Sequence, residues 1–441
     1  MQTNRERPSG AMPPAGDEGG LRRVLGPVDI ALLTVGSVIG SGIFLVPGQV
    51  LAGAGGHAGW ATVLWLAGGV LALCGALSYA SLAESRPQAG GLYLFIRDGF
   101  GRTAGFLFGW MMVFVGVAGT TAALAAAFAT LVSPWLPGVP QPLLAGLAAA
   151  AIGAGALLPS RGARDLQNGT ALLKLLPLLA IAIWLLVTAP EAGVASSVHA
   201  TPQSAGPGIA VALISVLWAF EGWQYVTYAC GEFSNPRRSI RIGLIGGVAI
   251  LGVTFVLVTL AVGRWLPEAT SGNVVAQALV AAGHMGTARF VDVVVVIAVL
   301  SAAHATLLTG SRLVYAIAGD GLLPGPLARL TSRHRVPAAA VVLGAAVGIV
   351  LGGVGSFDAL LGYIVVTSWL FYALAALAVF RLLPSAGIGT RLAAIVFAAG
   401  ALAMVSVSLL TGPPSARYGL VVLAVGGLFG HLWLRSRASQ G

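Results

Sequence analysis

The feature that most constrains this chain is a series of apolar segments, each long enough to cross a lipid bilayer. A bilayer core of about 30 Å requires about 20 apolar residues in helical form. The segments comprise residues 27–54, 58–83, 103–132, 141–158, 166–188, 207–230, 240–263, 289–317, 336–353, 357–380, 391–410 and 417–434. Each is continuously apolar, whereas a membrane strand would alternate over about 10 residues. The sequence therefore predicts an all-α polytopic membrane protein with twelve transmembrane helices.

Composition excludes most other classes of protein. Hydrophobic residues make up 57% of the 441 positions and charged residues only 9%, whereas soluble proteins carry about 25% charged residues. Cys74 and Cys230 both fall within apolar segments and indicate no disulfide framework. The chain contains neither HExxH nor a GxxxxGK phosphate loop. We therefore expect a transporter with no cofactor and no metal, and neither an enzyme nor an ATP-driven pump.

The positive charges are distributed unevenly around these segments. Of the 24 Lys and Arg residues, twenty fall before the first segment, after an even-numbered segment or at the chain end. Cytoplasmic loops are enriched in Lys and Arg. The pattern predicts a protein of the cytoplasmic (inner) membrane with both termini cytoplasmic, including polar tails at residues 1–26 and 436–441. The net charge of +10 thus reflects the orientation of the chain in the membrane and does not indicate a nucleic-acid partner.

Two segments contain residues that disfavour a continuous helix. Residues 36–44 read GSVIGSGIF, with three glycines and two serines near mid-membrane. This predicts an unwound stretch and a new half-helix near Gly42, whose exposed N–H groups would attract a carboxylate. Close helix packing of the GxxxG type is the alternative interpretation. In the sixth segment, residues 218–224 read WAFEGWQ and place Glu221 and Gly222 mid-span, where an ionisable residue is costly and usually functional.

Interruptions at the same position of two five-helix halves are typical of an inverted repeat. The halves would comprise residues 27–188 and 207–380, with two further helices in residues 391–435. Together they would form one transporter domain, residues 27–435.

Several motifs resemble the amino acid–polyamine–organocation superfamily, and in particular bacterial L-amino acid transporters. They are Gly40-Ser41-Gly42-Ile43-Phe44, Phe220-Glu221-Gly222-Trp223, Asn235-Pro236-Arg237, Pro87-Gln88-Ala89-Gly90-Gly91 and Gly319-Asp320-Gly321. The resemblance implies that an amino acid binds between the breaks of helices one and six. It implies a substrate site formed by Val38, Ile39, Gly40, Ser41, Gly42, Trp218, Ala219, Phe220, Glu221, Gly222 and Trp223.

The resemblance also assigns a role to Lys174 in the fifth segment. Related transporters carry a lysine there, whose ammonium takes the place of a sodium ion. By this analogy Lys174 would reach carbonyls near Gly40 and the hydroxyl of Ser301, and transport would be sodium-independent. Snorkelling of the Lys174 side chain toward the cytoplasmic interface is the alternative.

Other interpretations stay open at this point. Glu221 could couple transport to protons, contact a cationic substrate or anchor the second half-helix. His304 either faces the substrate pocket or is a buried neutral side chain. Phe220 and Trp223 are either gates or packing aromatics. Glu232 is a candidate partner of Arg237 and Arg238 at the inner gate.

Two positions depart from the family pattern, because Ser81 and Leu92 stand where many relatives have acidic residues.

The predicted function is secondary transport of amino acids by alternating access, either by exchange or with protons. The alternatives are a cationic amino acid or polyamine carrier and a non-transporting membrane sensor. The expected partners are a small-molecule amino acid substrate and membrane lipid, with no nucleic acid. The oligomeric state and the presence of a partner chain are left open.

Overall fold

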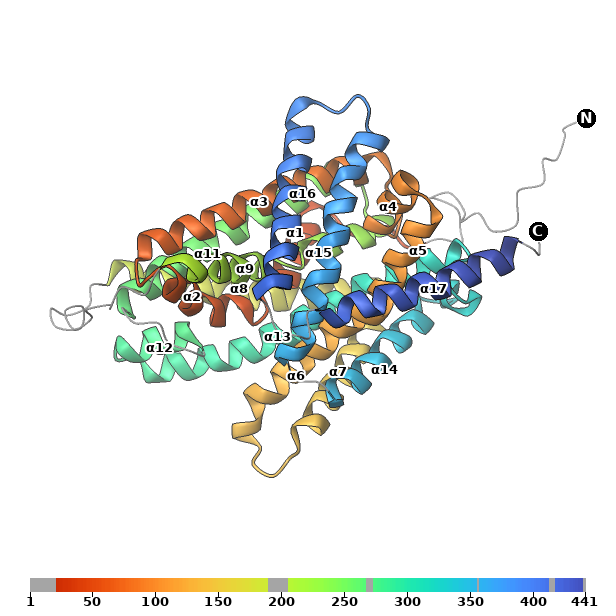
Figure 1. Ribbon diagram of the computed structural model, residues 1–441. Coiled ribbons are helices and arrows are strands. Elements are labelled where there is room, and N and C mark those ends of the chain that lie inside the picture. The colour runs from red at the N-terminus through yellow and green to blue at the C-terminus, as the bar shows by residue number, and fades with distance from the viewer. Residues whose placement is uncertain (1–20, 189–204, 267–272, 355–356, 412–416, 439–441) are drawn as a thin grey trace, which may run out of the picture.

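The computed structural model is all-helical (Figure 1). It describes residues 21–188, 205–266, 273–354, 357–411 and 417–438. Within these ranges the β-structure consists of a single isolated bridge, between Leu25 and Phe233. Most of the predicted N-terminal tail, residues 1–20, and residues 439–441 of the C-terminal tail lie outside the described residues.

The first half of the chain contains the elements α1 to α8. They are α1 (Pro27–Val38), α2 (Gly42–Gly53), α3 (Ala58–Ser85), α4 (Leu92–Phe100), α5 (Arg102–Met111), η1 (Met112–Val117), α6 (Ala118–Val132), η2 (Ser133–Trp135), α7 (Gln141–Ala156) and α8 (Ser160–Val187).

The second half contains α9 to α15, and two more helices follow. They are α9 (Ala205–Ala219), η3 (Trp223–Glu232), α10 (Pro236–Ile240), η4 (Arg241–Ile245), α11 (Gly246–Trp265), α12 (Val274–Ala281), α13 (Met285–Gly319), η5 (Gly325–Ala328), α14 (Ala338–Val354), α15 (Phe357–Leu382), α16 (Ile388–Thr411) and α17 (Tyr418–Ala438).

Six helices or end-to-end helix sets within the described residues are long and apolar enough to cross a membrane. They include α3, α13, α16 and the continuous stretch formed by α5, η1 and α6. Shorter apolar helices include α1, α7 and α14. Each of the predicted apolar segments coincides with one helix or with consecutive helices. The chain is therefore a polytopic all-α membrane protein.

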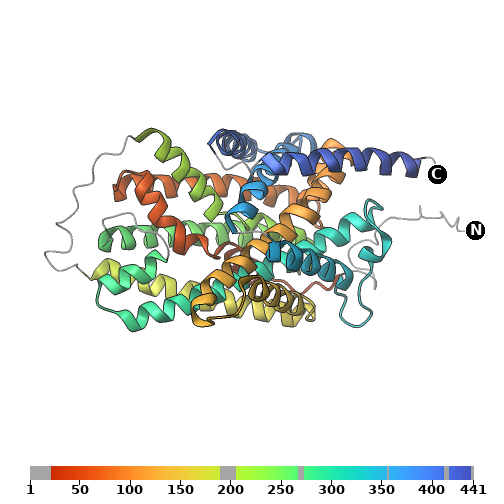
Figure 2. The same ribbon diagram turned by 60° about the horizontal axis from the view of Figure 1, so that its bottom comes forward.

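Two α-helices lie wholly outside the predicted apolar segments. These are α4, which follows α3, and α12, which precedes α13. α4 and the C-terminal end of α17 lie at one end of the molecule, and α2 and α12 lie at the other (Figures 1 and 2).

The centre of the molecule is α13. It contacts α1, α6, α7, α8, α14 and η3, and most of its side chains from Val291 to Ala318 are buried. These include the polar residues Thr306, Thr309 and Arg312. A helix surrounded by other helices can carry such groups at membrane depth because the neighbouring helices supply their partners.

Glycines allow some helices to approach closely. A Cβ atom added to Gly53 at the end of α2 would lie 2.5 Å from the Gly208 carbonyl oxygen and 2.6 Å from Ala212 Cβ, both on α9. Small residues at such crossings let the helix backbones touch.

We predict that Gly53→Ala lowers the stability of the protein, because overpacking of a close helix contact costs about 1–3 kcal/mol. The melting temperature of the detergent-solubilised protein measures this loss. Gly59→Ala on α3 is the matched control, because a Cβ atom there meets nothing within 4 Å. Equal melting temperatures for the two variants would contradict the α2–α9 contact.

Candidate functional site

The predicted interruption of the first segment is present. α1 ends at Val38, α2 begins at Gly42, and residues 39–41 between them are not helical. Gly40 N–H donates to the Val38 carbonyl at 2.7 Å, and the buried hydroxyl of Ser41 has no hydrogen-bond partner. The first N–H groups of a helix also lack partners within it. The start of α2 therefore presents hydrogen-bond donors next to an unused hydroxyl.

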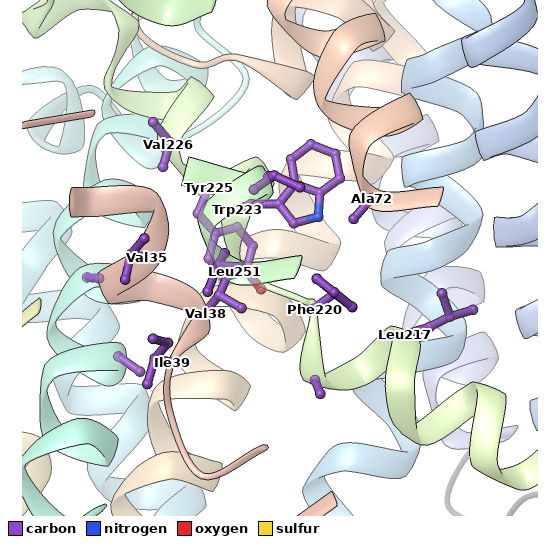
Figure 3. Packing of buried hydrophobic residues seen from close by; sticks show 14 of the residues in the cluster. Val35, Val38, Ile39, Ala72, Leu217, Phe220, Trp223, Tyr225, Val226 and Leu251 are labelled. Atoms are coloured by element: carbon purple, nitrogen blue, oxygen red, sulfur yellow. The ribbon is translucent and has the colours of Figure 1, made fainter. Parts of the chain in front are cut away.

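The sixth segment is interrupted at residues 220–222, between α9 and the 3-10 helix η3. Gly222 has φ +124°, a conformation that L side chains rarely adopt. A Cβ atom on Gly222 would lie 2.6 Å from the carbonyl oxygen of Ser37 in the last turn of α1. The glycine thus allows the two breaks to touch. Val38, the last residue of α1, lies beside Tyr225 of η3 (Figure 3).

A cavity lies where the two breaks meet. α6, α13 and α15 complete its wall. Its lining residues are Ser37, Val38, Gly40, Ser41, Gly42, Thr120, Ala123, Leu124, Trp218, Ala219, Glu221, Gly222, Tyr225, Ala302, Thr306 and Ile364. The wall thus combines small residues with hydroxyl groups and one carboxylate.

Three residues of the predicted substrate site do not line this cavity. The Phe220 ring packs between Trp65 and Phe255, with ring centroids 6.0 and 4.9 Å away. Trp223 packs against Tyr79 and Phe397, so both aromatics serve the packing between helices. Ile39 is fully buried, and its carbonyl oxygen is bound to Lys174.

Lys174 of α8 is fully buried. Its ammonium donates hydrogen bonds of 2.6 Å to the carbonyl oxygens of both Gly36 and Ile39. These carbonyls lie at the C-terminal end of α1, where the helix dipole favours a cation. Lys174 therefore does not snorkel to the interface but closes the open end of α1.

Lys174 reaches a carbonyl oxygen next to Gly40, that of Ile39, and Gly36 about one turn earlier supplies the second acceptor. The Ser301 hydroxyl pairs instead with Thr170 Oγ1 at 2.8 Å. Thr170 precedes Lys174 by one turn on α8, so Ser301 supports the helix that carries the lysine.

Glu221 is held by two side chains that the sequence did not single out. Trp369 Nε1 donates to Glu221 Oε2 at 3.2 Å, and Tyr372 Oη donates to Oε1 at 3.1 Å. Both donors lie on α15, three residues apart and therefore on one face of the helix. That spacing of two aromatic donors in an apolar segment was the available signal, but it did not identify Glu221 as the acceptor.

Two further expectations are corrected or resolved by side-chain contacts. Glu232 does not pair with Arg237 or Arg238; its carboxylate accepts from Arg312 Nε at 2.5 Å, and both side chains are buried.

His304 is buried outside the central cavity, with Nδ1 3.0 Å from Gln167 Oε1.

The loop after α3 leads into a polar network that involves neither Ser81 nor Leu92. Leu92 is buried and Ser81 donates to its own helix at the Leu77 carbonyl. The Tyr93 hydroxyl instead donates to Asp320 at 2.6 Å, and Arg97 also binds Asp320. Burial and the Asp320 carboxylate raise the pKa of Tyr93, so the hydroxyl stays a donor.

Among the described residues, no three His, Cys, Asp or Glu side chains are grouped so that they could hold a metal ion.

Comparison with known proteins identifies the family. The family model "Amino acid permease" matches residues 25–429. The chain belongs to the amino acid permease family. It is therefore a transporter of amino acids and not an enzyme, as the motifs predicted.

Curated relatives cover most of this permease. The b(0,+)-type amino acid transporter 1 of Oryctolagus cuniculus is 28% identical over 365 residues, which are 80% of this chain and 74% of the relative. The serine/threonine exchanger SteT of Bacillus subtilis is 25% identical over 83% of this chain and 84% of its own length. The branched-chain amino acid permease BcaP of Bacillus subtilis is 26% identical over 78% and 77%.

We predict that Gly222→Ala abolishes transport in a protein that still folds. A non-glycine residue with positive φ costs about 1–2 kcal/mol, and the added Cβ atom would push the Ser37 carbonyl away. Initial uptake rate and melting temperature are the measurements. Gly252→Ala on α11 is the control, because its Cβ atom would meet nothing within 4 Å. Normal uptake by Gly222→Ala would contradict the contact between the two breaks.

Proposed function

We propose that this permease carries amino acids across the cytoplasmic membrane by alternating access, without sodium, as an exchanger or a proton-coupled symporter. The observation that carries this proposal is the cavity at the junction of the two broken helices. It is lined by backbone from both breaks and lies beside the Lys174 ammonium.

The proposed topology has twelve membrane crossings with both termini in the cytoplasm. α1–α8 and α9–α15 would form two inverted five-helix repeats, followed by α16 and α17. The matching interruptions, after Val38 and after Ala219, support this arrangement. The distribution of the arginines supports the orientation.

The substrate would bind with its two charged ends on the two breaks. Its carboxylate would accept hydrogen bonds from N–H groups at Ser41 and Gly42 and from the unpartnered Ser41 hydroxyl. Its ammonium would meet carbonyl oxygens near Val38, Trp218 and Ala219. The Ile39 carbonyl is excluded from this role because Lys174 occupies it.

Lys174 supports sodium independence. A sodium site in a protein is a set of oxygen ligands around one positive charge, and the Lys174 ammonium already supplies that charge to two carbonyl oxygens. A second cation at the same place would meet strong repulsion at low dielectric.

The cavity wall favours a neutral substrate. Ala123, Leu124, Ala302 and Ile364 give it an apolar side, and relatives are named for serine/threonine exchange and branched-chain amino acid transport. A carrier of cationic amino acids or polyamines is the second candidate, because the Glu221 carboxylate lines the cavity.

The test is uptake of a panel of labelled amino acids into proteoliposomes. We predict equal initial rates with external sodium or choline, because the Lys174 ammonium occupies the carbonyls of the α1 break. Counter-substrate inside the vesicles and an imposed pH gradient distinguish exchange from proton symport. A requirement for a sodium gradient would refute the role of Lys174, and absence of uptake or exchange of every amino acid and amine would refute the function.

We predict that Glu221→Gln changes transport rate, substrate selectivity or pH profile. The amide keeps the size of the side chain and an acceptor for Trp369 or Tyr372 but removes the negative charge from the cavity. Loss of a charge-assisted hydrogen bond costs about 1.5–3 kcal/mol, which corresponds to roughly a tenfold change or more in KM. Tyr372→Phe removes one of the two donors to Glu221 but retains the charge, so it separates the effect of a lost hydrogen bond from that of the lost charge. If the rate, selectivity and pH profile of Glu221→Gln all matched the parent protein, a direct role of Glu221 would be excluded.

A further inference from the structure

A further cavity, of about 230 Å³, lies between α7, α8 and α13; we call it the side cavity. Most of its wall is apolar and is formed by Ile152 of α7, Leu166 of α8, and Ile297 and Leu300 of α13. An apolar cavity of about 150 Å³ admits benzene. The side cavity therefore has room for a molecule of about nine non-hydrogen atoms.

The helix α13 separates the side cavity from the central cavity. Ala302 and Thr306 of this helix line the central cavity, whereas Ser301 and His304 line the side cavity. None of the described residues lines both. A molecule in the side cavity would therefore not occupy the space between the two breaks.

The side cavity opens on the outer surface of the helices. Ala151 and Leu166, which line it, are exposed, and so are Leu147 of α7 and Val293 of α13. Both α8 and α13 lie in stretches that are long and apolar enough to cross a membrane. Exposed apolar side chains on such helices mark a surface in contact with lipid, so the opening leads to the bilayer.

Two hydroxyl groups in the wall use their protons within the protein. Thr170 Oγ1 donates to the Leu166 carbonyl oxygen at 2.9 Å and lies 2.8 Å from Ser301 Oγ. Because a hydroxyl has one proton, Ser301 is the donor of this pair. Both oxygens can therefore only accept further hydrogen bonds.

His304 adds a buried acceptor that has no partner. Only 5% of the residue is exposed, and Nδ1 lies 3.0 Å from Gln167 Oε1. An amide oxygen can only accept, so Nδ1 carries the proton and Nε2 of the neutral ring is an acceptor. Nε2 makes no hydrogen bond. It lies beside Gly155, which also lines the cavity, since a Cβ atom added there would be 3.4 Å from Nε2.

These features define the chemistry of a ligand. A carboxylate would place further acceptors against Nε2, and an ammonium would bring an unpaired charge into an apolar site. A hydrocarbon would fill the space but leave Nε2 without a donor. A hydroxyl group supplies that donor and carries no charge.

We propose that the side cavity binds an uncharged amphiphile with a hydroxyl group and a short hydrocarbon body, such as a medium-chain alcohol, which enters from the bilayer. The hydroxyl donates to His304 Nε2, and the hydrocarbon packs against Ile152, Ile297 and Leu300. This site goes beyond the proposed transport function and does not depend on it, because the ligand and the amino acid lie on opposite sides of α13.

The experiment is photolabelling of the purified protein in lipid nanodiscs with a diazirine analogue of octanol, followed by peptide mass spectrometry. We expect adducts on residues of α8 and α13 that line the side cavity. Excess octanol should lower their yield at least about tenfold, whereas nonane at the same concentration in the bilayer should lower it less than about threefold, because nonane leaves Nε2 unpaired. His304→Phe removes the acceptor and should make the two competitors equal within about threefold.

Two exposed positions on α7 give a matched pair of variants. Ala151→Phe places a ring at the opening and should lower the yield at least about fivefold, because the ring fills space that the ligand needs. Ala154→Phe is the control, because Ala154 is also exposed but does not line the side cavity; its yield should stay within about twofold of the parent.

Adducts confined to residues outside the side cavity would overturn the proposal. So would equal competition by octanol and nonane in the parent protein, or an equal loss of yield in Ala151→Phe and Ala154→Phe. The assay contains no amino acid, so failure of uptake would refute the proposed function without deciding the result here.

Discussion

The rest of the site depends on how the backbone of α1 is satisfied where the helix stops inside the protein. A helix that ends at membrane depth leaves carbonyl oxygens that lipid cannot solvate. The Lys174 ammonium binds two of them, at Gly36 and Ile39. The backbone of residues 39–41 can therefore leave the helical hydrogen-bonding pattern without a large free-energy penalty. α2 can then begin at Gly42, a residue that lines the central cavity.

The second break completes the cavity because glycine lets it touch the first. Gly222 lies against the Ser37 carbonyl in a conformation that other residues rarely adopt. Glu221, one residue earlier, is fixed by Trp369 and Tyr372 of α15. The two breaks and α15 thus form one structural unit around the cavity, and movement of α15 would be transmitted to the carboxylate.

Sequence patterns predicted what depends on local chemistry. Glycines and serines at 36–42 and Gly222 marked both interruptions, because unwound backbone requires such residues. The Ile39 acceptor of Lys174 lies next to Gly40, as the family resemblance implied. Ser301 pairs with Thr170 instead, and no local pattern identifies such a contact between two helices. The Glu232–Arg312 pair joins residues 80 apart in the chain, and nothing local identifies such a partner. Phe220 and Trp223 likewise pack against residues of α3, α11 and α16. The sequence of the sixth segment alone cannot identify these partners.

In the proposed mode of binding, the two breaks hold the two charged ends of one amino acid. Equilibrium binding to the purified protein in sodium-free buffer tests it most directly, comparing a transported amino acid with its methyl ester and with the amine that lacks the carboxylate. Each analogue loses one charge-assisted contact set, worth about 3 kcal/mol or more, so both should bind at least about a hundredfold more weakly. Binding of either analogue as tightly as the amino acid would contradict the account.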